Sequence, residues 1–343
     1  MADITVRGAG IFGLSIAWAC LQRGARVAVI DPNGLGAGSS GGLVGALAPH
    51  VPENWNAKKA FQLDSLLRAE SFWSDVEAAG GVSAGYARTG RLQPISDARS
   101  LELAHQRANS AAKLWADHAR WQVERAPDAD WSPISTTGWL IRDTLSAHLH
   151  PRHACVALGA ALASKGVTVE RDGSSAGAVI WATGVAGLAD LNRGHTRQVG
   201  NGVKGQAALL EFDARGAPQI FADGVHIIPH QDGTVAVGST SERDYDDPTA
   251  TDAQLDTVIA KARGAVPVLA SAPVLERWAG VRPRTRSRAP MLGPWPGRPG
   301  HFVANGGFKI GFGMAPKVAD VMANLVLDGI NEIPEAFGIA ASL

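Results

Sequence analysis

Cysteine, surplus charge and long apolar runs are all scarce in this sequence. The two cysteines, Cys20 and Cys155, stand far apart among 343 residues, which excludes a disulfide scaffold, a four-cysteine zinc site and a closely spaced redox pair. The 32 basic residues equal the 32 acidic residues, so the chain lacks the basic excess of a general nucleic-acid or anionic-membrane binder. The apolar run at 11–21 is broken by Gly13 and Ser15 and is shorter than the ~20 residues of a membrane span. Without a basic segment before that run, the sequence predicts a soluble cytoplasmic protein.

Glycine, by contrast, is abundant. The chain has 40 glycines, about 12% against a usual ~7%, and such an excess often marks backbone that must approach a ligand closely. With 45% hydrophobic and 19% charged residues, the composition is that of a globular chain. At about 150 residues per domain, the length favours two domains.

The N-terminal segment carries the strongest motif. A β-branched run at 4–6 leads into Gly8, Gly10 and Gly13, followed by a helical stretch, a second apolar strand and Asp31. In such a unit the first glycine permits a tight turn, the second lets backbone approach a pyrophosphate, and the third permits close helix–strand packing. The helix N-terminus attracts phosphate, and the acidic residue can accept a ribose hydroxyl. This order favours a dinucleotide-binding unit over a simple glycine turn between packed elements.

Three later segments favour FAD over a nicotinamide cofactor. Residues 34–45 hold six glycines directly after the ribose-binding acid, which suits a loop beside a large cofactor better than a flexible linker. Residues 177–184 are typical of a buried strand that ends in Ala-Thr-Gly, and 302–313 of a strand and glycine loop leading into a helix. The N-terminus of that helix can stabilise negative charge on a reduced flavin.

The motifs as a set are specific to one family. In chain order they are GAGIFG at 8–13, Asp31, SSGGL at 39–43, WATG at 181–184, VKGQ at 203–206, GVRPRT at 280–285, MLGP at 291–294 and NGGFKIGFGMAP at 305–316. This combination, which covers almost the whole chain, resembles the FAD-dependent D-amino-acid oxidase family, in particular its glycine oxidase-like and sarcosine oxidase-like branch. The pairing of GVRP with GFGMAP is far more specific than the N-terminal motif alone.

The resemblance implies an α/β fold with two domains. One is a Rossmann-type FAD-binding domain, glutathione-reductase-like and discontinuous in sequence, which we predict to comprise 1–50, 140–190 and 285–343. The other is an α+β substrate-binding domain with a mostly antiparallel sheet, predicted at 51–139 and 191–284. Apolar spacing and capping residues predict helices at 58–79, 98–120, 151–164 and 252–263, and a strand at 167–169.

The resemblance also implies which residues hold the cofactor. Neither cysteine lies in a recognised flavin-attachment motif, so FAD is expected to be non-covalent. The predicted cofactor contacts are Gly8, Gly10, Ile11, Phe12, Gly13, Asp31, Ser39, Ser40, Gly41, Gly42, Leu43, Val169, Ala182, Thr183, Gly184, Gly306, Gly307, Phe308, Lys309, Ile310 and Gly311.

The predicted catalytic residues are Arg282, Lys309 and His226. An amino-acid substrate needs a cation for its carboxylate, and an arginine offers a bidentate fork. The resemblance gives this role to Arg282, within an arginine-rich stretch that Pro283 predicts to be an irregular strand. Lys309 is predicted to face flavin or substrate, with a surface charge as the alternative. His226 is a candidate for the pocket wall, with a core or surface histidine as the alternative.

Other histidines are weaker candidates. His50 and Trp55 follow the first glycine-rich loop and are candidates for positions near the flavin. His148, His150 and His153 have spacings loosely like those of metal ligands. Because no cysteine or acidic residue stands beside them, we interpret them as surface residues at a helix start and predict no metal site.

The resemblance implies hydride transfer from the substrate α-carbon to flavin N5. The imine would be hydrolysed to an oxo acid and ammonia, and O2 would reoxidise the flavin to give H2O2. Three alternatives stay open: a D-amino-acid dehydrogenase that uses a quinone or another acceptor, an oxidoreductase of a modified tRNA nucleoside, and a non-catalytic flavin-binding subunit. The expected partners are a small amine or amino acid and an electron acceptor, without nucleic acid or a membrane span, and a homo-oligomer is left open.

Overall fold

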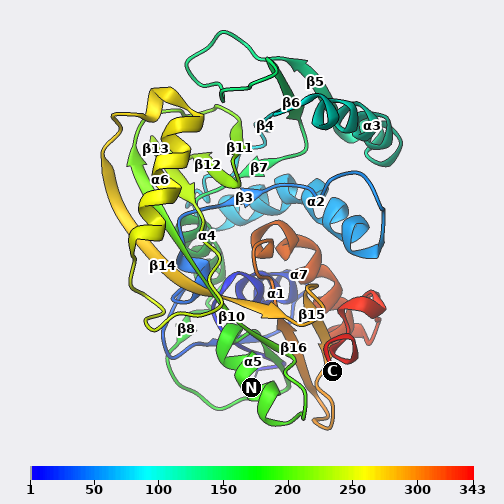
Figure 1. The fold of residues 1–343 in the computed structure, drawn as a ribbon. Coiled ribbons are helices and arrows are strands. Elements are labelled where there is room, and N and C mark those ends of the chain that lie inside the picture. The colour runs from blue at the N-terminus through cyan, green and yellow to red at the C-terminus, as the bar shows by residue number, and fades with distance from the viewer. Residues whose placement is uncertain (1) are drawn as a thin grey trace.

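A computed structural model describes residues 2–343, which form two main β-sheets with helices around and between them (Figure 1). Within that range the seven α-helices are α1 (Ile11–Gln22), α2 (Ala57–Gly80), α3 (Ala98–Leu114), α4 (Pro151–Ser164), α5 (Gly184–Arg193), α6 (Ala253–Ala265) and α7 (Gly311–Asp328). The short 3-10 helices are η1 (Ser39–Gly41), η2 (Ala116–His118), η3 (Pro267–Leu269), η4 (Glu335–Phe337) and η5 (Ile339–Ser342).

The lower sheet in Figure 1 has, among the described residues, six strands in the order β15-β16-β9-β1-β2-β8. Its strands are β1 (Ile4–Arg7), β2 (Val27–Ile30), β8 (Val169–Glu170), β9 (Ala178–Trp181), β15 (Met291–Pro294) and β16 (His301–Asn305). All neighbours pair in parallel except β15 with β16. A parallel sheet is covered on its faces by helices, which agrees with the buried apolar residues of β1 and β2.

The upper sheet has, in the same part of the chain, eight strands in the order β14-β10-β13-β12-β11-β4-β6-β5. These strands are β4 (Arg91–Pro94), β5 (Trp121–Arg125), β6 (Trp139–Asp143), β10 (Gly200–Glu211), β11 (Gln219–Ala222), β12 (Val225–Pro229), β13 (Thr234–Gly238) and β14 (Val274–Thr285). Its pairs are antiparallel apart from β4 with β11. A separate pair joins β3 (Ala46–Leu47) to β7 (Ala147–His148).

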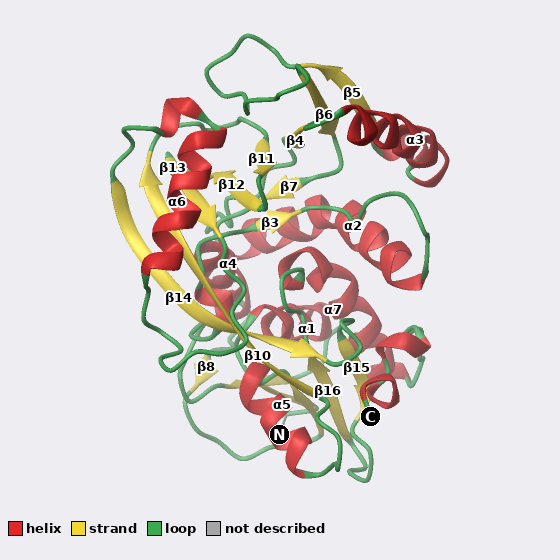
Figure 2. Cartoon of the chain, viewed as in Figure 1, coloured by secondary structure: helices red, strands yellow, loops and turns green. Residues whose placement is uncertain are grey.

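Helices fill the space between the sheets. Figure 2 shows α1, α2 and α7 in the middle of the molecule, where α7 contacts both of the others and α2 also contacts α4. One large apolar cluster runs through this layer and includes Val6, Trp73 and Met314. Side-chain caps fix three helix starts: Asn56 accepts from Lys59 N before α2, Asp97 from Ser100 N before α3, and Asp252 from Gln254 N before α6.

The structure confirms the expected α/β fold and changes several element boundaries. The helix predicted at 98–120 ends at Leu114, because Ala116 turns the backbone to φ 47° before η2 and β5. The strand predicted at 167–169 is the two-residue β8.

The arginine-rich stretch is irregular as expected, but the strand ends after Thr285 and not at Pro283, and Arg288 has φ 61°. Strand β14 continues through Pro283 to Thr285, paired with β10 along its length. It lies at the edge of the upper sheet, where a strand tolerates a residue without an N–H.

We propose a domain division that follows the two sheets. The six-stranded sheet takes its strands from three separate parts of the chain, between residues 4 and 30, 169 and 181, and 291 and 305. Because β6 belongs to the upper sheet, the second FAD-binding segment would begin after residue 143 rather than at 140.

Candidate functional site

A cavity of about 1210 Å³ opens where the two sheets approach each other. The turns after β1, β9 and β16 line one side of it, and residues of β12 and β14 line another. Ligands of parallel α/β sheets bind in the crevice at the carboxyl ends of the strands. Ligand pockets usually measure about 300–1,000 Å³, so this cavity can hold a large cofactor together with a small substrate.

The turn after β1 is made of backbone. Gly8 has φ +109°, and a Cβ there would overlap the carbonyl of Ala182. A Cβ on Gly13 would overlap the carbonyl of Gly8, so α1 can begin directly against β1 only with glycine there. Gly10 lines the cavity instead, and the nearest atom to a Cβ there would be Ser40 Oγ, at 3.2 Å. The outer two glycines therefore shape the turn, while the middle one leaves room for a ligand.

Asp31 follows β2 and braces this turn. Its Oδ2 accepts a hydrogen bond from Ala9 N at 2.8 Å, and its Oδ1 accepts one from Asn33 N at 2.9 Å. A carboxylate has about four acceptor positions. Asp31 also lines the cavity, so it retains the capacity to accept a ribose hydroxyl.

The segment 39–43 crosses the N-terminus of α1. Ser40 Oγ accepts a hydrogen bond from Ile11 N at 3.0 Å, one of the N–H groups that a helix start leaves unpaired. Helix α4 supports this segment from outside, because Arg152 donates to Gly41 O at 2.8 Å and the Cys155 thiol to Ser40 O at 3.8 Å. Burial raises the pKa of Cys155 to about 12, so this contact is made by a neutral thiol.

The turn after β9 presents Ala182, Thr183 and Gly184 to the cavity at the start of α5. Thr183 Oγ1 is buried and has no hydrogen-bond partner within residues 2–343. Asn305 fixes the turn, since its Nδ2 donates to Gly184 O at 2.8 Å. Buried polar atoms are almost always paired, so the free hydroxyl indicates a place where a ligand would bond.

The loop at 306–310 leads into α7. Gly306 has φ +75°, and a Cβ there would overlap the Thr285 methyl group. Gly311 and Phe312 line the cavity, so the positive end of α7 borders it. Phe308 N donates to Pro283 O at 3.2 Å, which ties this loop to the strand that carries Arg282.

Most predicted cofactor residues line this cavity. They are Gly8, Gly10, Ile11, Phe12, Asp31, Ser39, Ser40, Gly42, Leu43, Ala182, Thr183, Gly184, Gly306, Gly307, Phe308, Lys309, Ile310 and Gly311. Gly13, Gly41 and Val169 are outside the lining: Gly13 faces β1, Gly41 is held by Arg152, and Val169 pairs with Val29 in the edge strand β8. Two helix starts, a glycine turn, a ribose-type acid and an unpaired hydroxyl around one cavity fit an FAD molecule.

Arg282 lies at the cavity wall in β14. Its side chain is only 9% exposed, and the guanidinium crosses Gly205 of β10 at a point where a Cβ would overlap it. Its Nη1 donates to Thr240 O at 3.3 Å, and no carboxylate of residues 2–343 is within salt-bridge distance. Burial lowers the pKa of Arg282 to about 10, although the nearby Glu242 opposes the shift. At pH 7 the residue is thus a charged guanidinium without an ionic partner.

Lys309 and His226 complete this side of the cavity. Burial against the wall and the charge of Arg282 lower the pKa of Lys309, whose side chain is solvent-accessible in the cavity. Burial, together with the charges of Arg91, Lys309 and Arg282, lowers the pKa of His226 to about 3. His226 packs on Phe221 with ring centroids 4.7 Å apart. It is a neutral wall residue among three cations.

Sequence reasoning missed Arg91, Gln62 and Trp278, which also line the cavity. Arg91 forms a buried ion pair with Asp143, Nε to Oδ2, at 2.9 Å. Gln62 binds the backbone N of His50 at 2.8 Å, which places His50 at the cavity as expected. No motif marks these residues, because each reaches the site only through the pairing of distant elements.

The structure does not place Trp55 at the cavity, and it buries two of the three histidines at 148–153. Trp55 is not part of the cavity lining among the described residues. His148 is 0% and His150 6% exposed, so interpreting them as surface residues is wrong, whereas His153 is exposed. His148 is covered because it pairs with Ala87 in a β-bridge, and His150 is covered because the ring of His230 packs against its own ring.

Comparisons with known proteins agree with this site. The family model described as "FAD dependent oxidoreductase" matches residues 3–325. A glycine oxidase of Pseudomonas aeruginosa is 34% identical over 125 residues, which are 36% of this chain and 34% of that protein. The chain thus aligns with about a third of that relative's length. A putative thiamine biosynthesis oxidoreductase ThiO of Rhizobium etli is 27% identical over 94% of this chain and 96% of its own length.

Solved structures share the fold. A glycine oxidase from Geobacillus kaustophilus superposes with a TM-score of 0.83 at 20% identity, over 98% of both chains. An iminodiacetate oxidase from Chelativorans sp. BNC1 superposes with a TM-score of 0.84 at 21% identity, also over 98% of both chains. Within residues 2–343, no helix has the length and apolarity to cross a membrane. The match over residues 3–325 and the cavity together show that the chain belongs to the FAD dependent oxidoreductase family and takes FAD as its cofactor.

Proposed function

We propose that this protein oxidises the C–N bond of a small amino acid or amine, such as glycine, sarcosine or a D-amino acid, with non-covalently bound FAD. The observation that carries the proposal is Arg282, a buried guanidinium at the cavity wall whose described hydrogen bond is to a single carbonyl. Such a group is costly to bury unpaired, and a substrate carboxylate would pair with it in bidentate fashion. The glycine oxidase and ThiO names of the relatives support the same substrate class.

Bound FAD supplies the acceptor for a hydride from the substrate α-carbon. Arg282 would hold the carboxylate, and its link through Pro283 to the loop at 306–310 sets the substrate at a fixed position relative to the cofactor side. The low pKa of His226 keeps this residue uncharged, so it would shape the pocket without exchanging a proton at neutral pH. Hydrolysis of the imine to an oxo acid and ammonia would complete the substrate half-reaction.

The test is anaerobic flavin bleaching. The holoprotein is mixed without oxygen with glycine, sarcosine, D-alanine, D-aspartate and simple amines, and the loss of flavin absorbance is followed. We expect bleaching by at least one carboxylate-bearing amine. Iminodiacetate belongs in this panel because the solved structure of an iminodiacetate oxidase shares the fold. If no amine bleaches the flavin, the proposal is wrong.

The electron acceptor separates the main proposal from its nearest alternative. We propose O2 as the acceptor, with one H2O2 formed for each substrate oxidised. A D-amino-acid dehydrogenase would bleach equally well without oxygen but would need a quinone or another acceptor for turnover. Peroxide measured in air, with and without an added quinone, distinguishes the two. A gel shift with tRNA tests the further alternative of a modified-nucleoside substrate, which the balanced charge of the chain opposes.

A further inference from the structure

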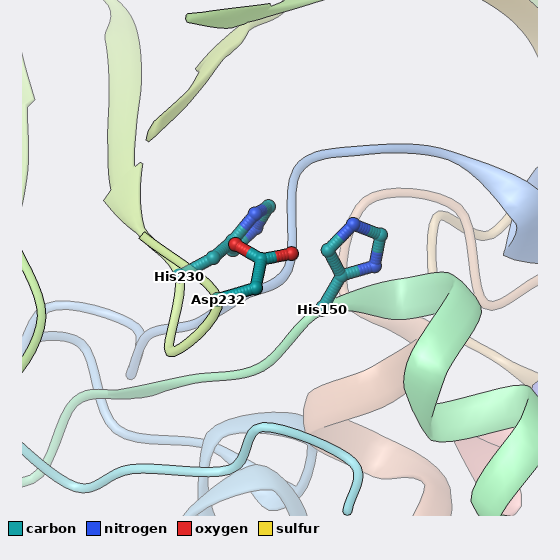
Figure 3. Close-up of side chains that lie close together, drawn as sticks. All are labelled: His150, His230 and Asp232. Carbon is teal, nitrogen blue, oxygen red and sulfur yellow. The ribbon is translucent and has the colours of Figure 1, made fainter. Parts of the chain in front are cut away.

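A second group of chemically active side chains lies outside the flavin cavity. His230 and Asp232 stand in the turn between β12 and β13, and His150 caps the start of α4. One ligand atom from each of the three lies within 4.8 Å of the others. Figure 3 shows the three side chains gathered together, and the ring centroids of His150 and His230 are 4.4 Å apart.

The histidines of this group have ring nitrogens that nothing in the described chain satisfies. His150 Nδ1 and His230 Nε2 are buried without a hydrogen-bond partner among residues 2–343, as are both ring nitrogens of the neighbouring His148. His150 and His230 are 6% and 1% exposed. Buried polar atoms without partners are rare, and each one calls for an explanation. Several orphaned nitrogens gathered beside a carboxylate indicate a missing ligand that is itself an electron-pair acceptor.

We propose that His150, His230 and Asp232 bind a divalent transition-metal ion of the zinc type. Two imidazoles and a carboxylate form a nitrogen and oxygen donor set that suits zinc, with a fourth position left for water. Asp232 Oδ1 accepts hydrogen bonds from Thr234, so Oδ2 is the oxygen available to the metal.

The geometry requires a small contraction. Donor atoms on one tetrahedral zinc ion are about 3.4 Å apart, given bonds of about 2.0–2.1 Å, so side-chain rotation must close the group. Asp232 is exposed, which leaves it free to rotate and gives the ion a path of entry. The positive end of α4 opposes a cation, but a helix end changes affinity by less than about tenfold. The adjacent charge of Arg152 is neutralised by Glu276 through two hydrogen bonds, of 2.6 and 2.9 Å.

Such an ion would join the two halves of the molecule. It would link the β12–β13 turn of the upper sheet to α4, the helix whose Arg152 and Cys155 hold the segment 39–43 beside the flavin cavity. Because the ion would bridge these two parts of the fold, metal binding is expected to raise the stability of the folded state. This inference does not depend on which amine the protein oxidises.

The experiment uses the untagged holoprotein after treatment with a chelator. Zinc is titrated by calorimetry, metal content is measured after dialysis, and the thermal midpoint is recorded with and without zinc. We expect one zinc ion per chain, a dissociation constant below 10 µM and, at a hundredfold excess over that constant, a rise of about 4 °C in the midpoint.

The decisive variant is Asp232→Asn, because asparagine keeps an Oδ1 acceptor for Thr234 while the charge is lost. It should weaken zinc binding at least tenfold and abolish the rise in the midpoint, and His230→Gln should do the same. The matched controls are Asp246→Asn and His105→Gln, both exposed residues elsewhere, which should leave both readouts unchanged. The proposal is overturned if zinc binds more weakly than 100 µM, or if Asp232→Asn binds it as tightly as the original protein.

Discussion

The two walls of the flavin cavity are made of different parts of the chain. The wall formed by the six-stranded sheet is mainly backbone, made of glycine turns and helix starts, each of which is a local unit of the chain. The wall formed by the upper sheet is mainly side chains, with Arg282, His226 and Arg91 delivered by three separate strands. The first wall fits a cofactor common to many enzymes, while the second carries the charges that select a substrate. Substitutions should therefore have different consequences on the two sides.

The largest effect is expected from the glycine turn. Gly13→Val places a side chain against the carbonyl of Gly8, so the protein should fail to fold and its soluble yield should collapse. Gly10→Val points into the cavity instead, so the protein should fold but lose its flavin. Circular dichroism and the ratio of flavin to protein absorbance separate these results. A Gly10→Val protein with its full flavin content would contradict the inference that Gly10 leaves room for the cofactor.

Arg282→Leu should leave FAD binding intact and impair the binding of the substrate carboxylate. Removal of one partner from a buried ion pair costs about 3–5 kcal/mol, so kcat/KM for an amino acid should fall by roughly a hundredfold to several thousandfold. Arg282→Lys should recover only part of this, because a point charge replaces a planar fork.

The control for Arg282 is the substrate itself. Amines without a carboxylate should lose far less activity in Arg282→Leu, while flavin content should stay unchanged. If both substrate types suffer equally, or if amino-acid oxidation stays within about threefold of the original, then Arg282 does not bind the carboxylate, and Lys309 becomes the next residue to test.

Arg91 lies on the same wall but is engaged with Asp143, which is 0% exposed. Arg91→Leu would leave that carboxylate buried without its partner, so the free energy of unfolding should fall by about 3–5 kcal/mol. The double variant Arg91→Leu with Asp143→Leu should recover most of the loss, because no buried charge remains. Urea unfolding curves of the three proteins measure this, and a double variant as unstable as the single one would argue against the ion pair as the cause.

The smallest effect is expected in the pH dependence of stability, to which His226 contributes. Its pKa of about 3 lies below the ~6.5 of a free imidazole, so the unfolded chain binds one more proton between those values. The stability contribution of the neutral ring is complete above about pH 6.5 and declines as the pH falls toward 3. His226→Gln should reduce the slope of stability against pH in that window by at most about 1.4 kcal/mol per unit.

Thermal midpoints measured between pH 4 and 8 test this slope. His105→Gln is the matched control, because His105 is exposed and should leave the slope unchanged. A His226→Gln protein with the original pH dependence would show that this imidazole titrates normally.

The same comparison explains what the sequence could predict. The cofactor wall follows local rules, because a strand, a glycine turn and a helix adjacent in sequence are adjacent in space, and most residues named for FAD do line the cavity. The role of Asp31 in bracing Ala9 could not be anticipated, since it depends on the curvature of the turn.

The substrate wall depends on pairings between distant strands. Arg282 was named only because a family motif surrounds it, whereas Arg91 has no such motif and meets Asp143 through the pairing of β4 with β6. The prediction that His148 and His150 lie at the surface was wrong for the same reason, because their neighbour His230 comes from a hairpin turn far along the chain. Sequence spacing shows how residues of one element are arranged, but it does not show what the fold places over them.

Gly205 has a consequence for how this protein can change its substrate. The guanidinium of Arg282 occupies the volume that any side chain at Gly205 would need, so the two positions are epistatic. A mutation at Gly205 alone would displace the arginine, and a smaller residue at 282 alone would open a void above the glycine. A lineage that moves toward uncharged substrates can therefore accept a side chain at Gly205 only after Arg282 has been replaced, and a library that varies the two positions as a pair is the direct way to explore that transition.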